Sequence, residues 1–198
     1  MLNKFRVRLQ PVIELLGNSF ASLGLSANFW TICAMLLSIV AALLYASAAP
    51  SIGLIRFNAI ILGGIVLLIS GFFDVVDGTV ARVTKSSSRK GSFLDSSLDK
   101  LSEVAVFLGL AIGDLAEPLL CMIALSLSLI VSYIRARAES LGIELKGIGI
   151  GERAERLLIL AIIGMIPISG AMQWAVVIVS IIAGITIVQR MVATYKKL

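Results

Sequence analysis

Two long uncharged stretches constrain this chain most strongly. No charged residue occurs from Leu15 to Ile55, and none occurs over residues 157–189. A helix needs only about 20 apolar residues to cross the ~30 Å hydrocarbon core of a membrane. The second stretch would be about 50 Å long as one helix, so we expect a break at Pro167–Gly170 to divide it into two spans. With 59% hydrophobic and 15% charged residues, an ordinary water-soluble domain is excluded.

The hydrophobic pattern predicts an all-α membrane protein with six transmembrane helices. The first span starts near Asn28 and ends at Pro50; the next three cover about 57–74, 91–112 and 118–140, and the last two flank the break at Pro167. Residues 1–22 mix basic and apolar side chains, which is typical of an amphipathic helix lying in the membrane interface. Residues 23–198 would then form a single transmembrane domain.

The basic residues predict the orientation of this layout. All Lys and Arg residues except Arg56 fall on the side that holds both termini, the 84–91 loop and the 138–153 loop. By the positive-inside rule, that side and both termini face the cytoplasm. The net charge of +5 is therefore explained by a cytoplasmic face rich in Lys and Arg, and nucleic acid is not an expected partner. The chain has no His, and its two cysteines, Cys33 and Cys121, lie in apolar runs, so no zinc site or disulfide framework is indicated.

Four aspartates lie where the second span ends and the third begins: Asp74, Asp77, Asp95 and Asp99. Spacings of three and four residues put each pair on one helix face. Converging carboxylates repel each other in a poorly hydrated site and need cations. Carboxylates without His or Cys select Mg²⁺ or Mn²⁺, and four are enough for two ions. Pairing with nearby basic residues is the simpler interpretation, but Asp74 follows an apolar helix, where ionisable groups are usually functional.

Small residues and one arginine accompany these aspartates. Gly78 follows Asp77 directly, and Ala81 keeps the same helix face small, so that a ligand could approach the backbone closely. Arg82 is well placed to meet a phosphate, and Gly91 precedes Asp95 by one helical turn. Helix–helix packing is an equally good explanation of the glycines.

Residues 74–99 read DVVDGTVAR, eight further residues, then GSFLDSSLD. This resembles the signature of the CDP-alcohol phosphotransferase family, D-x2-D-G-x2-A-R-x8-G-x3-D-x3-D, at every fixed position. The resemblance implies a six-span enzyme, usually a homodimer, that transfers a phosphatidyl group from a CDP-lipid to an alcohol and releases CMP. It implies that the four aspartates bind two divalent ions, Mg²⁺ or Mn²⁺.

The resemblance also implies roles for individual residues. Asp99 would accept the proton of the attacking hydroxyl in addition to binding metal. The residues expected to contact the CDP-lipid are Asn28, Phe29, Trp30, Thr31, Gly78, Ala81, Arg82, Ser88 and Gly91. Trp30 is also expected near the membrane interface, as tryptophans commonly are.

A second basic cluster bears on the acceptor alcohol. Arg135, Arg153 and Arg156 flank a Gly-rich turn, and Arg190 ends the last span. Several arginines at the bilayer edge suit a dianionic phosphate, although snorkelling and pairing with nearby glutamates would also explain them. The segments SYIRARAE and ERAERL are similar to the branch of the family that makes phosphatidylinositol phosphate or archaetidylinositol phosphate. That similarity implies 1L-myo-inositol 1-phosphate as acceptor, although Ala154 replaces a proline common in the branch.

Several alternatives stay open at this point. Glycerol 3-phosphate is the next acceptor to consider, and serine the third. The CDP-lipid could be CDP-diacylglycerol or CDP-archaeol. Because carboxylates in membranes also mark ion pathways, a divalent-cation transporter is the main non-enzyme alternative, but no acidic residues continue along the other half of the bilayer.

Overall fold

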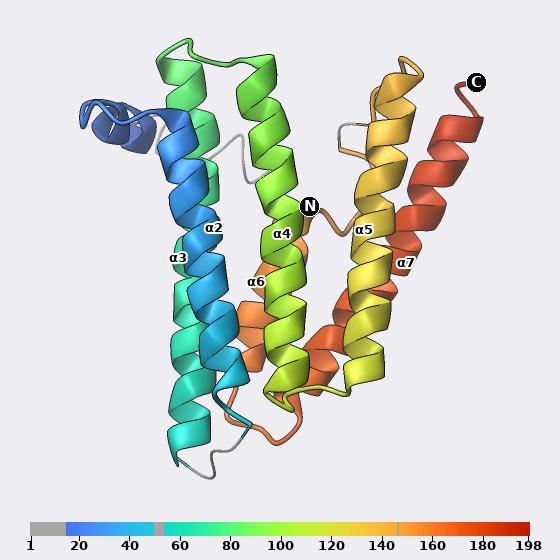
Figure 1. Cartoon of the computed structure of the whole chain (residues 1–198). Helices are drawn as coiled ribbons and strands as arrows, with labels where there is room; N and C mark the ends of the chain where they lie inside the picture. Colours follow the sequence, from blue (N-terminus) through green and yellow to red (C-terminus); the bar gives the residue numbers. More distant parts are fainter. Residues whose placement is uncertain (1–14, 50–53, 146) are drawn as a thin grey trace.

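The computed structural model describes residues 15–49, 54–145 and 147–198, and the described chain contains helices and connections but no strand. Residues 15–21 are helical and are followed by six longer helices that form one bundle (Figure 1). These are α2 (Ala27–Ala46), α3 (Leu54–Val83), α4 (Arg89–Ile112), α5 (Pro118–Ser140), α6 (Arg153–Gly164) and α7 (Ala171–Tyr195). The all-α prediction is confirmed for these residues.

The helix ends follow from local sequence. Ser26 and Ser88 are the N-caps of α2 and α4, and each hydroxyl accepts a hydrogen bond from the backbone N–H three residues later, as N-cap serines commonly do. Pro118 occupies the first turn of α5, where its missing N–H costs nothing. Gly170 precedes α7 with a φ of 76°, a left-handed conformation that glycine adopts readily. The break expected at Pro167–Gly170 therefore lies between α6 and α7.

Helix α2 packs against both α3 and α4, α5 packs against α7, and α6 lies against α3 and α7. Apolar side chains such as Tyr45, Phe107 and Leu160 fill the interior. The contact between α2 and α4 depends on glycine. A Cβ atom at Gly109 would lie 2.4 Å from the Ala42 carbonyl oxygen, so only glycine allows the two backbones to meet there.

Four of the described helices are long and apolar enough to cross a membrane: α2, residues Ile55–Val83 of α3, α5 and α7. The chain is thus a multi-pass membrane protein, whereas six spans stay a prediction. Helix α4 has 24 residues, but its first half carries the charged residues of the cluster described below. Helix α6 has only 12 residues, about 18 Å, which is less than the ~30 Å hydrocarbon core.

The shortness of α6 has a structural cause. The preceding connection, described for residues 141–145 and 147–152, folds into the bundle instead of extending the helix. Leu145 is fully buried, and the Gly151 N–H donates to the Thr186 hydroxyl of α7 at 3.0 Å. Helix α6 therefore starts deep in the bundle, well below the ends of its neighbours (Figure 1).

The basic connections share one end of the bundle. The start of α2, the turn between α3 and α4 and the ends of α5 and α7 all lie there (Figure 1). Arg56 is near the opposite end, where it donates a hydrogen bond to the Asp114 carbonyl oxygen. This grouping agrees with the charge asymmetry that the orientation was predicted from.

Two predictions fall partly outside the described residues. The expected interfacial helix covers residues 1–22, of which 1–14 are not described, and Pro50, the expected end of the first span, is not described either. The helical residues 15–21 project to the side of the bundle beside α2 (Figure 1). Phe20 joins this segment to the bundle through an edge contact with Trp30, with ring centroids 5.0 Å apart.

Candidate active site

Three of the four predicted metal ligands converge. Each of Asp74, Asp95 and Asp99 offers a carboxylate oxygen, and these three oxygens lie within 4.8 Å of one another. Asp74 comes from α3, while Asp95 and Asp99 project from one face of α4 because they are four residues apart. Since α3 and α4 both pack on α2, these side chains meet across the space between the two helices.

The fourth aspartate, Asp77, lies outside that group of three. It is 5% exposed, and its Oδ2 atom has no hydrogen-bond partner among the described residues. A buried carboxylate oxygen without a partner is costly, which suggests that a ligand normally satisfies it. Clustered carboxylate oxygens are the donors that Mg²⁺ and Mn²⁺ prefer, so these residues fit the expected metal.

Arg153 supplies positive charge to this carboxylate cluster. Its Nη1 atom lies 2.8 Å from Asp74 Oδ1 and 2.5 Å from Asp99 Oδ1. Arg153 is the first residue of α6, and it reaches this depth because the described residues of the preceding connection fold into the bundle. Arg153 is one of the arginines predicted to bind the acceptor phosphate, and in the structure it also bridges carboxylates of α3 and α4.

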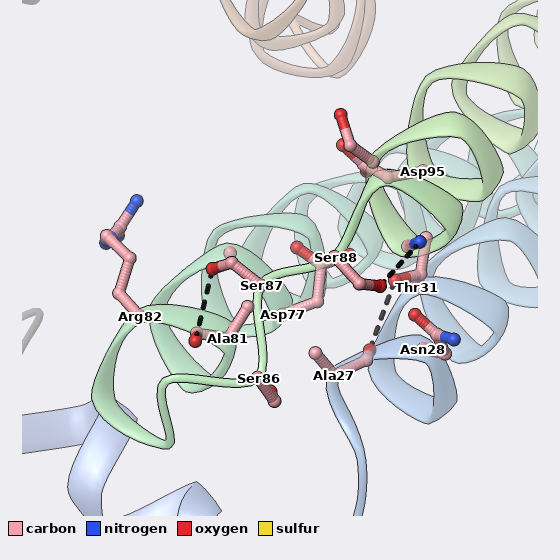
Figure 2. Close-up of a pocket in the computed structure, with 13 residues that line it drawn as sticks. Ala27, Asn28, Thr31, Asp77, Ala81, Arg82, Ser86, Ser87, Ser88 and Asp95 are labelled. Carbon is pink, nitrogen blue, oxygen red and sulfur yellow. Dashed lines mark hydrogen bonds between the residues drawn. The ribbon is translucent and has the colours of Figure 1, made fainter.

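A first cavity opens beside Asp77, between the start of α2, the end of α3 and the start of α4. It is lined by Ala27, Asn28, Thr31, Asp77, Gly78, Ala81, Arg82, Ser86, Ser87, Ser88, Gly91, Ser92 and Asp95. Figure 2 shows the labelled side chains around this space, with Arg82 at its edge. All residues expected to contact the CDP-lipid line this cavity except Phe29 and Trp30.

The structure separates the two interpretations of the glycines. A Cβ atom at Gly78 would meet only Arg82 Nη1, at 3.9 Å, so Gly78 borders open space rather than a packed helix. At Gly91 a Cβ atom would lie 3.2 Å from both Asn28 Oδ1 and Ser88 Oγ. Gly78 therefore leaves room for a ligand, whereas Gly91 permits close packing of α4 on α2.

The two aromatic residues of α2 lie away from the first cavity. Trp30 is buried and stacks on Phe73, with ring centroids 5.3 Å apart and planes inclined by 7°. Phe29 is 43% exposed and contacts the edge of Trp30. Trp30 thus packs against protein side chains near the start of α2, and its expected position near the membrane interface stays a prediction.

A second cavity of about 390 Å³ lies on the other side of α4, within the usual size range of small-molecule sites. It is lined by Ser92, Asp95, Ser96, Asp99, Lys100, Val131, Ser132, Arg135, Ala136, Glu139, Glu152, Arg153, Arg156 and Arg190. All four arginines of the predicted acceptor site are among them. Because Ser92 and Asp95 line both cavities, the two cavities adjoin at the carboxylate-bearing face of α4.

The arginines of the second cavity differ in what holds them. Arg135 is exposed and pairs with Glu139 at 2.9 Å, which agrees with the alternative that these arginines pair with nearby glutamates. Arg156 is buried against Glu103, with Nη2 2.6 Å from Glu103 Oε1. Arg190 is also buried, and it donates to the carbonyl oxygens of Ile148 and Val131. These fixed positions concentrate positive charge on one wall.

Two charged residues of this region were not assigned a role from sequence: Lys100 and Glu103. Glu103 is fully buried, and its carboxylate accepts hydrogen bonds from both Lys100 and Arg156. The available signal was an ionisable residue followed by a long apolar run in α4, a position that is expensive without a partner. The partner Arg156 lies 53 residues away, so the pairing itself could not be inferred.

Together the two cavities could hold two ligands whose reacting groups meet at Asp95 and Asp99. The first cavity offers small residues, hydroxyls and Arg82, which suit a large polar ligand with phosphates. The second is lined by five basic and four acidic residues, and its guanidinium groups suit a smaller anion. This arrangement suits a transfer reaction between a bound donor and a bound acceptor.

Comparison with known proteins gives a family match over most of the chain. A family model described as CDP-alcohol phosphatidyltransferase matches residues 25–188. The chain is 35% identical over 198 residues to the archaetidylinositol phosphate synthase of Pyrococcus horikoshii, covering 100% of this chain and 98% of that protein. It is 36% identical to the enzyme of the same name from Methanothermobacter thermautotrophicus, covering 100% and 96%.

Solved structures with a similar fold carry a related name. The phosphatidylinositol phosphate synthase of Mycobacterium tuberculosis with CDP-DAG bound matches with a TM-score of 0.76 and 27% identity, covering 93% of this chain and 94% of that one. The same protein in complex with manganese and citrate matches with a TM-score of 0.75 at 27% identity, covering 92% and 88%.

Proposed function

The chain belongs to the CDP-alcohol phosphatidyltransferase family, and we propose that it transfers the phosphatidyl or archaetidyl group of a CDP-lipid to a hydroxyl of 1L-myo-inositol 1-phosphate, releasing CMP. It is therefore an enzyme and not the cation transporter considered above. The observation that carries the acceptor assignment is the second cavity, which combines Asp99 with all four predicted arginines. The names of the two archaeal relatives support the same acceptor.

The CDP moiety binds in the first cavity. Gly78 leaves open space beside the α3 backbone, and Arg82 at the edge provides a guanidinium for a phosphate oxygen. Ser88 and Asn28 contribute polar groups from α4 and α2. The mycobacterial protein of similar structure was solved with CDP-DAG bound, which supports a CDP-lipid as the donor.

The clustered aspartates Asp74, Asp95 and Asp99, together with Asp77, hold two divalent ions, Mg²⁺ or Mn²⁺. When bound, such ions neutralise a pyrophosphate and stabilise the departing CMP. The 4.8 Å grouping of three carboxylates and the unpartnered oxygen of Asp77 support this assignment. A neighbouring structure contains manganese.

Asp99 accepts the proton of the attacking hydroxyl. The acceptor oxygen bonds to the lipid-linked phosphorus, and the bond between that phosphorus and the CMP oxygen breaks. A base must lie within hydrogen-bond reach of the hydroxyl. Asp99 lines the second cavity and also belongs to the carboxylate cluster, so it is available to both substrates.

The acceptor phosphate binds to the basic wall of the second cavity. Arg135 is the exposed member, while Arg156 and Arg190 are fixed by hydrogen bonds to the protein. Arg153 lines the second cavity and also forms an ion pair with the Asp74 carboxylate. Charge-assisted hydrogen bonds from arginines suit a phosphate dianion.

The membrane arrangement follows from the same proposal. Six membrane-spanning segments place the site and both termini at the cytoplasmic face, so that inositol phosphate arrives from the cytosol and the CDP-lipid from the bilayer. Helix α4 crosses the membrane with its charges turned toward the bundle interior. The functional unit is a homodimer.

A transfer assay tests the proposal. Purified protein is incubated with Mg²⁺ or Mn²⁺, labelled CDP-archaeol or CDP-diacylglycerol, and one acceptor at a time. We expect labelled phosphoinositol lipid and CMP with inositol 1-phosphate, and no product after chelation. Product with glycerol 3-phosphate or serine but none with inositol phosphate would overturn the acceptor assignment.

A further inference from the structure

The charged pair in the middle of α4, Lys100 and Glu103, lies at the wall of the second cavity and has no role in the proposed function so far. Glu103 has an exposure of 0%. One carboxylate oxygen accepts two hydrogen bonds from Arg156, at 3.1 and 2.6 Å, and the other accepts one from Lys100 at 3.1 Å. A buried carboxylate is tolerated when it is paired and hydrogen-bonded in this way.

The two cations on Glu103 are not equally available to a ligand. Arg156 is 1% exposed, and all three of its guanidinium nitrogens donate to Glu103 or to the Gly151 carbonyl oxygen. The Lys100 side chain is 30% exposed and lines the cavity. Lys100 is therefore the member of the pair that faces an incoming anion.

Two hydrogen bonds hold the Lys100 ammonium in place without using all of its N–H donors. Its Nζ atom donates to Glu103 at 3.1 Å and to the Ser132 hydroxyl at 2.8 Å. An ammonium carries three N–H donors, so one is left for a ligand. A lysine held at two points loses less conformational freedom on binding than a free surface lysine would.

The charge balance supports the same conclusion. Glu103 carries one negative charge and faces two cations, so this part of the wall keeps a net positive charge. Arg135, by contrast, is exposed and paired with Glu139. Lys100 is also the neighbour of Asp99 in sequence and shares the cavity with it, which puts the remaining N–H donor of its ammonium close to the expected position of the attacking substrate.

We propose that Lys100 binds the phosphate of the acceptor, and that Glu103 and Ser132 are positioning residues that hold its ammonium at the cavity wall. This inference rests on the proposed function and adds a fifth basic residue to the acceptor site.

Replacement of the lysine tests this directly. Lys100→Met keeps the length of the side chain and removes its charge. We expect the KM for inositol 1-phosphate to rise about tenfold or more while the KM for the CDP-lipid changes less than about twofold. Lys100→Arg, which restores a cation, should recover most of the loss. A purely structural lysine would instead affect both substrates alike, and that result would overturn the proposal.

Lys90→Met is the matched control. Lys90 lies on the same helix and is exposed, and it does not line either cavity. We expect both KM values to stay unchanged in this variant. An equal rise in acceptor KM for Lys90→Met would mean that general surface charge, and not a contact of Lys100, controls acceptor binding.

Two further measurements keep the test decisive. Ser132→Ala leaves all charges in place and should raise the acceptor KM about threefold, since one positioning hydrogen bond is lost. No change in this KM would argue against positioning by Ser132.

Calorimetric measurement of inositol 1-phosphate binding requires no turnover. Weaker binding by Lys100→Met than by the unaltered protein supports the inference even if transfer fails, equal binding contradicts it, and no binding by the unaltered protein contradicts both proposals.

Discussion

The two cavities on either side of α4 are built in different ways. The first cavity uses residues 27–31 and 77–95 and consists mostly of small side chains and hydroxyls at helix ends, with Asp77, Arg82 and Asp95 as its charged residues. The second cavity draws on α4, α5, α6 and α7, over residues 92–190, and consists largely of charged groups that compensate one another. A site formed by backbone and small residues can be encoded locally. Charges inside a membrane bundle need counter-charges, and these come from distant parts of the chain.

The strongest test of this comparison is Asp99→Asn, which changes the second cavity and the carboxylate cluster. We expect transfer to fall by about 10³-fold, because a general base is lost, while binding of CDP-lipid at the first cavity weakens only a few-fold. The measurement is turnover of labelled CDP-lipid alongside its direct binding.

Asp114→Asn provides the control for this variant. Asp114 lies at the opposite end of the bundle with a φ of 50°, a conformation that Asn tolerates as well as Asp. Its turnover should match that of the unaltered protein. Near-normal turnover of Asp99→Asn would show that another group takes the proton.

Gly78→Ala tests the first cavity alone. A methyl group there fills space otherwise available to a ligand, so the KM for CDP-lipid should rise about tenfold while the KM for the acceptor stays constant. The fold should gain up to about 1 kcal/mol, since alanine favours a helix interior over glycine. Steady-state kinetics and thermal unfolding measure the two effects.

Gly109→Ala is the matched glycine variant in the packed interior. Its methyl group would collide with the α2 backbone at Ala42, so unfolding should become easier by about 1–3 kcal/mol. A Gly78→Ala protein that lost stability in the same way would mean that Gly78 serves packing after all.

Arg153→Gln tests the charge that joins the two cavities. Arg153 contacts Asp74 and Asp99, so its loss leaves their mutual repulsion uncompensated. In EDTA the free energy of unfolding should fall by on the order of 1–2 kcal/mol. In Mn²⁺ the loss should be smaller, because the ion compensates the same carboxylates.

Thermal unfolding under both conditions provides the measurement, with Arg137→Gln as control. Arg137 is exposed, and among the described residues its side chain hydrogen-bonds to Ser140 of the same helix, so its replacement should have little effect in either condition. An identical loss for Arg153→Gln in EDTA and in Mn²⁺ would contradict a role at the metal site.

The smallest effects concern two helix caps. Ser88→Ala and Ser26→Ala each remove a hydrogen bond to a first-turn N–H and should cost about 1 kcal/mol of stability. Only Ser88 lines the first cavity, so only its replacement should raise the KM for CDP-lipid, by about threefold. If both variants had the same KM for CDP-lipid, Ser88 would serve only as a helix cap.

The contrast between the cavities also explains what could be predicted from sequence. Asp95 and Asp99 lie four residues apart on one helix, so their common face follows from helical geometry alone. The break before α7 was signalled by Pro167 and Gly170. The part of the first cavity formed by α3 and α4 follows from a short signature whose residues are near neighbours in the chain, whereas Asn28 and Thr31 of α2 lie outside that signature.

Features that depend on distant partners could not be predicted. Nothing local indicates that Arg153 reaches Asp74, 79 residues away, or that Glu103 pairs with Arg156. Helix α6 is short because the connection before it folds into the bundle, and a hydropathy pattern does not predict the path of such a connection. The contacts of Trp30 with Phe20 and Phe73 likewise join residues that are not neighbours in the sequence.

The glycine contacts between α2 and α4 restrict how a lipid could leave the protein. The two backbones approach closely at Gly109, beside Ala42, and at Gly113, beside the Tyr45 carbonyl oxygen. Hydrocarbon tails cannot thread between backbones that touch. Whatever chains a lipid substrate carries must therefore reach the bilayer without crossing this half of the α2–α4 joint, which confines the exit route to the rest of the circumference of the bundle.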